Sequence, residues 1–164
     1  MSIIKNKKSQ RGFTMIEILI AVFVLSVGLL GLAGLQAQSL QFNYSAYQRS
    51  QSNFLAYDII DRMRANRDEA LLGTYDIALA DSAPTDPGCQ ASGATCSTAQ
   101  MADFDLSQWI GDVESLLTEG DAAVALTVVG GRAQVTVTIR WLDNRSLPES
   151  DANRTETFTV STVL

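Results

Sequence analysis

An uninterrupted apolar segment near the N-terminus, residues 13–35, constrains this chain more than any other feature of its sequence. Its 23 residues contain one formal charge, on Glu17. As a helix they span about 35 Å at about 1.5 Å per residue, which is enough to cross the hydrocarbon layer of a bilayer, about 30 Å thick. We therefore expect residues 13–35 to form a transmembrane helix.

The charges that flank this segment predict its orientation. Residues 1–12 carry four basic residues and no acidic residue, and the first charge after Glu17 is Arg49. Because basic residues stay on the cytoplasmic side, we expect a single pass with the N-terminus in the cytoplasm and the rest of the chain exported. A retained anchor and a signal peptide cut near Ala37 both fit these residues.

The overall composition excludes several classes of function. The chain has 164 residues, no histidine, two cysteines, 12 basic and 18 acidic residues. Histidine is the commonest general base and metal ligand, and two cysteines cannot complete a four-ligand zinc site. We therefore expect no catalytic residues, no metal and no cofactor. The net charge of −6 also disfavours a nucleic-acid partner, since phosphate binding requires a basic surface.

Glu17 is the unusual residue of the apolar segment. An ionised carboxylate inside a membrane costs several kcal/mol and is usually retained because something pairs with it. One interpretation places Glu17 at the interface, where it reaches water. The other makes it a buried counter-charge for an amino group on a neighbouring chain.

Residues 11–17, Arg-Gly-Phe-Thr-Met-Ile-Glu, together with the apolar run that follows, resemble the class III signal peptide of type IV prepilins and type II secretion pseudopilins. The resemblance implies that residues 1–12 are a leader, which a prepilin peptidase removes after Gly12. It also implies that Phe13 becomes an N-methylated N-terminus and that Glu17 pairs with the terminal amine of an adjacent subunit. Residues 13–35 would then be the transmembrane, filament-core half of a longer helix.

Residues 36–67 are expected to continue that helix as its periplasmic half, because residues 36–66 contain no Pro or Gly. Large apolar residues recur there at spacings of three, four or seven and are expected to hold the head: Leu40, Tyr44, Tyr47, Phe54, Tyr57, Ile60 and Met63. A stacking platform for nucleic acid or sugar is the alternative. Charged residues between positions 58 and 68 are expected to form a solvated helix face.

Three glycines, Gly28, Gly31 and Gly34, lie inside the apolar half. Each costs a helix up to about 1 kcal/mol relative to alanine, and close helix packing is one explanation for them. The resemblance to pilins implies another, because this region of a pilin helix can lose its helical structure as a subunit leaves the bilayer. We therefore expect a weak point that eases extraction.

Residues 68–164 are expected to form a globular head. Cys89 and Cys96 lie in a turn-rich stretch, and export makes a disulfide that closes a loop over residues 89–96 the natural interpretation. Two free thiols are the alternative, and the six intervening residues exclude a Cys-x-x-Cys redox motif. Closing such a loop stabilises the head by about 2.5 kcal/mol in the chain-entropy model.

A second helix and a sheet follow the loop. Asp105, with Gln108 three residues on, is expected to cap a helix that ends before Gly120. Alternating patterns predict strands over residues 123–129, 132–142 and 155–163, with a two-residue Gly130-Gly131 turn joining the first pair. The expected fold is α+β and pilin-like: a long N-terminal helix packed on a small antiparallel sheet, with a second short helix.

A narrower resemblance extends over most of the chain. It rests on VGLLGLAGLQAQSL, on DRMRAN at residues 61–66, on the cysteine pair, and on ADFDLSQW at residues 102–109. These segments are similar to the minor pilins described as type IV pilus modification proteins. The resemblance implies partnership with other minor and major pilins, prepilin peptidase and the inner-membrane assembly platform, and a route from the bacterial inner membrane to a surface pilus. A secretion pseudopilin and an exported binding domain on an ordinary anchor are the alternatives.

Overall fold

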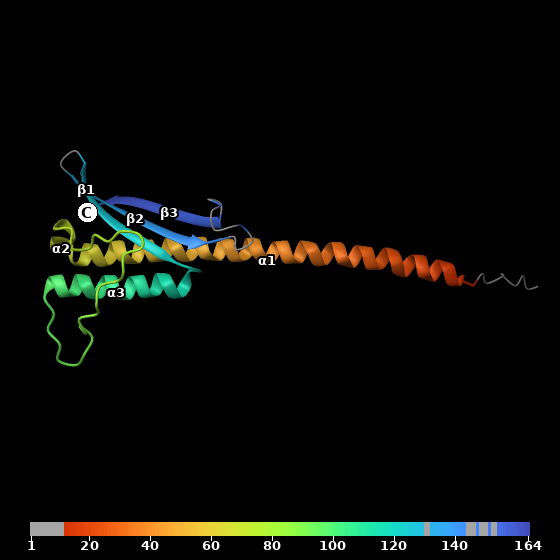
Figure 1. Cartoon of the computed structure of the whole chain (residues 1–164), viewed down its shortest axis with the longest axis horizontal. Coiled ribbons are helices and arrows are strands. Elements are labelled where there is room, and N and C mark those ends of the chain that lie inside the picture. The colour runs from red at the N-terminus through yellow and green to blue at the C-terminus, as the bar shows by residue number, and fades with distance from the viewer. Residues whose placement is uncertain (1–11, 130–131, 144–146, 148–150, 152–153) are drawn as a thin grey trace, which may run out of the picture. The chain divides into compact units, whose positions relative to one another are not determined.

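The computed structural model of the protein describes residues 12–129, 132–143, 147, 151 and 154–164 (Figure 1). Its elements are α1 (Met15–Ala65), α2 (Arg67–Leu71), α3 (Thr98–Leu116), β1 (Asp121–Val129), β2 (Arg132–Leu142) and β3 (Thr155–Val163). The chain divides into two units, residues 1–43 and residues 44–164, which are described separately below. The expected α+β fold is confirmed.

The first unit is the apolar half of α1. Thr14 caps the helix: its carbonyl oxygen accepts hydrogen bonds from the N–H groups of Glu17 and Ile18 at 3.1 and 3.3 Å, and its Oγ1 lies 3.4 Å from the Glu17 nitrogen. These bonds satisfy N–H groups that the start of a helix leaves without partners. The helix then continues to Ala65 without interruption, as the absence of proline predicts.

The second unit has its core between the second half of α1, helix α3 and one face of the sheet (Figure 1). Leu55, Ile59 and Met63 of α1 are buried there. Trp109 of α3 is fully buried, and its Nε1–H donates a hydrogen bond of 2.9 Å to the carbonyl oxygen of Leu55. This bond joins the two helices inside the core, where an unpaired indole N–H would be costly.

The sheet is antiparallel with the order β1-β2-β3, and its three strands confirm the prediction. Strand β2 has the expected bounds, and Val135, Val137, Ile139 and Trp141 are buried on one face, as the alternation predicts. Strand β1 begins two residues earlier than expected, at Asp121. The predicted Gly130-Gly131 turn lies outside the described residues.

The expected start of the second helix is wrong. Helix α3 begins at Thr98, where Ser97 and Gln100 form a capping box: the Gln100 N–H donates to Ser97 Oγ at 3.2 Å, and the Ser97 N–H donates to Gln100 Oε1 at 3.0 Å. Asp105 lies inside the helix, and its carboxylate accepts a hydrogen bond from the Tyr75 hydroxyl. Asp105, the cap expected from the sequence, therefore makes a tertiary contact instead, because Ser97 upstream already caps the helix.

The expected packing stripe on α1 is also largely wrong. Only Ile60 and Met63 of that stripe are buried, whereas the others are at least half exposed: Leu40, Tyr44, Tyr47, Phe54 and Tyr57. The residues that α1 does bury in this half include small and polar ones: Gln48, Ser52, Leu55, Ala56, Ile59, Ile60 and Met63. Small side chains let the helix approach its neighbours closely, so side-chain size alone misidentified the buried face.

Candidate assembly surfaces

The predicted processing site lies at the beginning of the described chain. Gly12 and Phe13 precede the first helical residue, and 81% of Phe13 is exposed, whereas residues 1–11 lie outside the described residues. Glu17 is exposed in the first turn of α1 and forms no ion pair with any described residue. Its carboxylate is therefore available to a charge on another molecule.

The apolar half of α1 exposes its large side chains on every side of the helix. The exposed set includes Ile16, Leu19, Phe23, Leu25, Leu30 and Leu35, each 61–74% exposed. By length and composition, α1 can cross a membrane. An apolar surface of this extent requires lipid or other helices to cover it.

Gly28, Gly31 and Gly34 do not interrupt α1. A Cβ built on any of the three meets no atom within 4 Å, so no described residue packs closely against them. Close packing within this chain therefore does not explain the glycines. Their intrinsic cost to helix stability remains, and the predicted weak point stays a prediction.

A second exposed surface lies on the half of α1 that belongs to the head. We call Tyr47, Phe54 and Tyr57 the aromatic stripe, and their exposed fractions are 50%, 70% and 51%. Leu55, the neighbour of Phe54, is 6% exposed, so the stripe lies on a face that is turned away from the core. Exposed aromatic side chains grouped on one element are typical of a contact surface.

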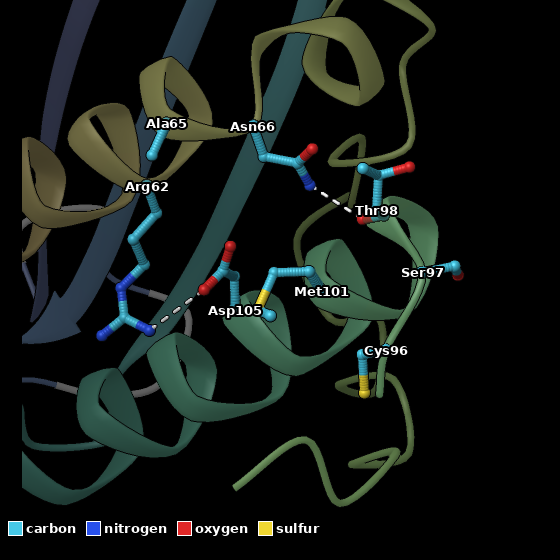
Figure 2. Close-up of a pocket in the computed structure, with 8 residues that line it drawn as sticks. All are labelled: Arg62, Ala65, Asn66, Cys96, Ser97, Thr98, Met101 and Asp105. Atoms are coloured by element: carbon cyan, nitrogen blue, oxygen red, sulfur yellow. Dashed lines mark hydrogen bonds and ion pairs between the residues drawn. The ribbon is translucent and has the colours of Figure 1, made fainter. Parts of the chain in front are cut away.

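A polar cluster ties the end of the α1 helix to α3. Asp105 is 8% exposed, and its Oδ2 accepts a hydrogen bond from the Tyr75 hydroxyl at 2.7 Å. Its Oδ1 lies 3.5 Å from Nη1 of Arg62 (Figure 2). Nε of Arg62 also lies 2.8 Å from Asp58. Burial, and then the hydrogen bond to Asp105, raise the pKa of Tyr75, so the phenol is neutral at physiological pH.

The spacing of charges in the sequence predicts a solvated face for Arg62 and does not reveal this cluster. One signal was present, since Asp105 occupies the same helix face as Leu106, Trp109 and Val113, all of which are buried. A carboxylate on a buried face requires a partner. The partner, Tyr75, lies 30 residues away in the chain, so local spacing could not identify it.

Glu69 and Asn66 continue the polar contacts around the start of α3. The side chain of Asn66 donates to the Thr98 carbonyl oxygen at 2.8 Å (Figure 2). The hydroxyls of Thr98 and Thr74 each donate to the Glu69 carboxylate at 2.8 Å. These two bonds, that from Thr98 first, lower the pKa of Glu69.

A hollow of about 360 Å³ lies beside these groups, lined by Arg62, Ala65, Asn66, Cys96, Ser97, Thr98, Met101 and Asp105. Its charged residues, Arg62 and Asp105, pair with each other. Among the described residues, no group of three or more His, Cys, Asp or Glu is arranged to hold a metal ion. The paired side chains beside this hollow therefore connect α1 to α3.

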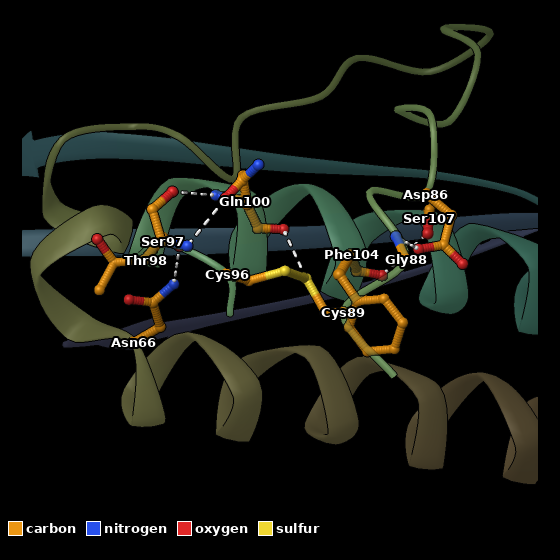
Figure 3. Close-up of a disulfide and its surroundings, with 10 residues drawn as sticks. All are labelled: Asn66, Asp86, Gly88, Cys89, Cys96, Ser97, Thr98, Gln100, Phe104 and Ser107. Carbon is orange, nitrogen blue, oxygen red and sulfur yellow. Dashed lines mark hydrogen bonds between the residues drawn. A yellow bond between two sulfur atoms is a disulfide. The ribbon is translucent and has the colours of Figure 1, made fainter. Parts of the chain in front are cut away.

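The expected disulfide is confirmed between Cys89 and Cys96, with their Cα atoms 5.8 Å apart (Figure 3). Cys96 immediately precedes Ser97, the cap of α3, and Sγ of Cys89 lies 3.8 Å from the carbonyl oxygen of Gln100. Gly88 adopts φ of +77°, which favours glycine, and its N–H donates to Asp86 at 2.7 Å. The disulfide thus fixes an exposed loop to the start of α3.

Two family models match the chain. Residues 7–33 match the prokaryotic N-terminal methylation motif, and residues 34–107 match the family described as type IV pilin Tt1218. Neither the curated proteins nor the solved structures contain a significant match.

These matches and the fold define a pilin-like structural subunit with a membrane-compatible N-terminal helix. The chain is a type IV prepilin. Pilins are structural subunits that interact with other pilins and with a prepilin peptidase, so the two exposed surfaces of α1 and the carboxylate of Glu17 are the candidate assembly sites.

Proposed function

We propose that this chain is a minor pilin of a type IV pilus, of the group named PilV, and that it helps to prime pilus assembly. Such a role supports adhesion and twitching motility. The observation that carries the proposal is Glu17, which has no ion pair among the described residues and lies at the start of an exposed apolar helix, five residues after Gly12. A carboxylate in that position requires a cation from outside the chain.

The proposed maturation begins with hydrolysis of the Gly12–Phe13 peptide bond by prepilin peptidase, followed by N-methylation of Phe13. Before assembly, the subunit is held in the inner membrane with its N-terminus in the cytoplasm and its head in the periplasm. The four basic residues before residue 13 support this orientation. The assembly platform of the inner membrane then transfers the subunit into the filament, where Glu17 pairs with the terminal ammonium of a neighbour.

Extraction from the bilayer uses the weak point formed by Gly28, Gly31 and Gly34. In the filament, neighbouring helices replace lipid around the apolar half of α1. The aromatic stripe, Tyr47, Phe54 and Tyr57, extends subunit contacts into the half of α1 that belongs to the head. Burying these rings on assembly removes apolar area from water, which stabilises the contact by about 25 cal/mol for each Å² buried.

The test compares Glu17→Ala with Glu114→Ala, a matched control that removes an exposed glutamate from α3. We expect both variants to be cleaved normally. We expect Glu17→Ala to lower the amount of subunit in sheared filaments by about tenfold or more, since an ammonium in a low-dielectric interior loses its partner. Normal incorporation of Glu17→Ala would contradict the proposal.

A type II secretion pseudopilin is the second candidate, because it shares the leader and the glutamate. Deletion of the gene distinguishes the two roles. A minor pilin predicts loss of surface filaments with normal protein secretion, whereas a pseudopilin predicts retention of a secreted substrate in the periplasm with filaments intact.

A further inference from the structure

The outer edge of β3 presents main-chain groups that have no partner among the described residues. The N–H of Leu164 donates to Ala133 at 3.2 Å, and the N–H of Asp143 donates to the carbonyl of Arg154 at 3.0 Å. Together with the register of β2 and β3, these bonds show that the even-numbered residues of β3 direct their main-chain N–H and C=O groups toward β2. Five residues therefore direct N–H and C=O groups outward: Thr155, Thr157, Thr159, Ser161 and Val163.

The opposite edge of the sheet is covered. Val124 of β1 exchanges two main-chain hydrogen bonds with Ile77, at 3.0 and 2.9 Å, and the N–H of Leu126 donates to Asp76 Oδ1 at 2.8 Å. Proteins usually protect an open edge with charge, proline or a covering segment. The outward residues of β3 are exposed, uncharged, and include no proline. Within the described part of the chain, one edge of the sheet is thus covered and the other is open.

A hollow of about 380 Å³ lies beside the open edge. It is lined by residues of α1, β2 and β3: Arg49, Ser50, Asn53, Trp141, Glu156, Thr157 and Phe158. Nη2 of Arg49 lies 3.1 Å from Oε2 of Glu156, and the buried Nε1 of Trp141 has no partner among the described residues. Because Thr157 is one of the outward residues, the hollow reaches the edge at which an added strand would lie.

We propose, building on the pilin function proposed above, that β3 accepts an extended segment of a different subunit of the same filament. Main-chain hydrogen bonds to the outward residues of β3 hold the segment, and the hollow receives one of its polar side chains. In strand addition, main-chain hydrogen bonds generally provide the affinity, and pockets for side chains provide the specificity. The nine residues of β3 provide an edge of about 30 Å.

A second copy of this chain fits the edge poorly. Arg49 contacts Glu156, and Nη2 of Arg67 donates to the carbonyl oxygen of Leu164 at 3.2 Å, so β3 runs alongside the second half of α1 in the same direction. In an antiparallel β3–β3 pair, the second half of α1 would run in opposite directions in the two copies, an arrangement that gives a closed two-fold dimer and not a filament. Residues 44–164 also carry 17 acidic and 8 basic residues, so two heads repel each other.

Hydrogen exchange at single-residue resolution tests the proposal on the full chain, first in detergent micelles and then in sheared filaments. We expect the amides of Thr157, Thr159 and Ser161 to exchange without protection in micelles and at least about tenfold more slowly in filaments. The amides of Phe158 and Val160, which face β2, should be protected in both states and serve as the internal reference.

A matched pair of variants provides the second readout. Thr159→Pro removes one outward N–H, at an edge position that tolerates proline, whereas Thr159→Val keeps it. We expect the proline variant to melt like the valine variant but to enter filaments about tenfold less.

Four results would overturn the proposal. Unprotected outward amides in filaments, or equal incorporation of the two variants, would refute strand addition alone. Protection already present in micelles, with the mass of a dimer, would assign the edge to a second copy. Absence of the cleaved wild-type chain from filaments would refute the filament role and strand addition together.

Discussion

Phe54 and Leu55 are neighbours on α1 with opposite expected roles. Leu55 is 6% exposed and belongs to the core, whereas Phe54 is 70% exposed and belongs to the aromatic stripe. Leu55→Ala should lower the free energy of unfolding by about 2–5 kcal/mol, because it removes buried methyl groups and leaves a cavity. Phe54→Ala should change it by no more than about 0.5 kcal/mol. The hydrogen bond from Trp109 to Leu55 uses the main-chain oxygen and survives both changes.

Thermal unfolding of the full chain in detergent micelles measures this difference. Trp109 and Trp141 are both buried, so their fluorescence reports on the head. A loss of about 3 kcal/mol corresponds to a melting temperature lower by about 10 °C in a head of this size. Phe54→Ala should melt like the wild type and enter filaments less efficiently. Equal destabilisation by the two substitutions would refute the assignment of the buried face, and normal incorporation of Phe54→Ala would refute the role of the stripe.

Three further predictions concern the disulfide, Tyr75 and the glycines. Cys89→Ser should lower the unfolding free energy by about 2.5 kcal/mol without affecting cleavage, as measured by thermal melting under oxidising conditions. The raised pKa of Tyr75 means that the unfolded chain loses its phenol proton first, so stability should fall as the pH rises above about 10; Tyr75→Phe should flatten this loss in melts across that range. Replacing Gly28, Gly31 and Gly34 together by Ala should slow filament entry, read as subunit left in the membrane.

Each of these predictions has a contradicting result. A melting temperature that is unchanged in Cys89→Ser would remove the stabilising role of the disulfide. A wild type and a Tyr75→Phe variant that lose stability equally with rising pH would show that the raised pKa of the phenol does not govern alkaline stability. Unchanged filament entry of the triple alanine variant would show that the glycines do not ease extraction, since no described atom would clash with the added methyl groups.

Regular alternation made the sheet predictable. Strands β2 and β3 have the expected bounds, because one face of each strand packs on the core and the other meets water. The apolar half of α1 was predictable for a similar reason, since its length and composition depend on no distant residue. The cysteine pair was predictable because the two residues are close in the chain.

Contacts between distant residues were not predictable. Asp105 resembles a helix cap in its local sequence, but its role is set by Tyr75, and Arg62 resembles a solvated residue until α3 brings Asp105 within 3.5 Å. The buried face of α1 includes Ser52 and Ala56, which no size-based pattern selects. The side-chain amide N–H of the fully buried Gln48 donates to the Thr118 hydroxyl at 2.9 Å, a partner 70 residues away.

The state of the N-terminus tests the central claim most directly. The measurement is the intact mass and N-terminal peptide map of the protein from its native membrane, in cells with and without prepilin peptidase. A chain that begins at N-methylated Phe13, found only in cells with the peptidase, is the predicted result. An uncut chain in normal cells, or a cut near Ala37, would contradict the account and remove the proposed role of Glu17.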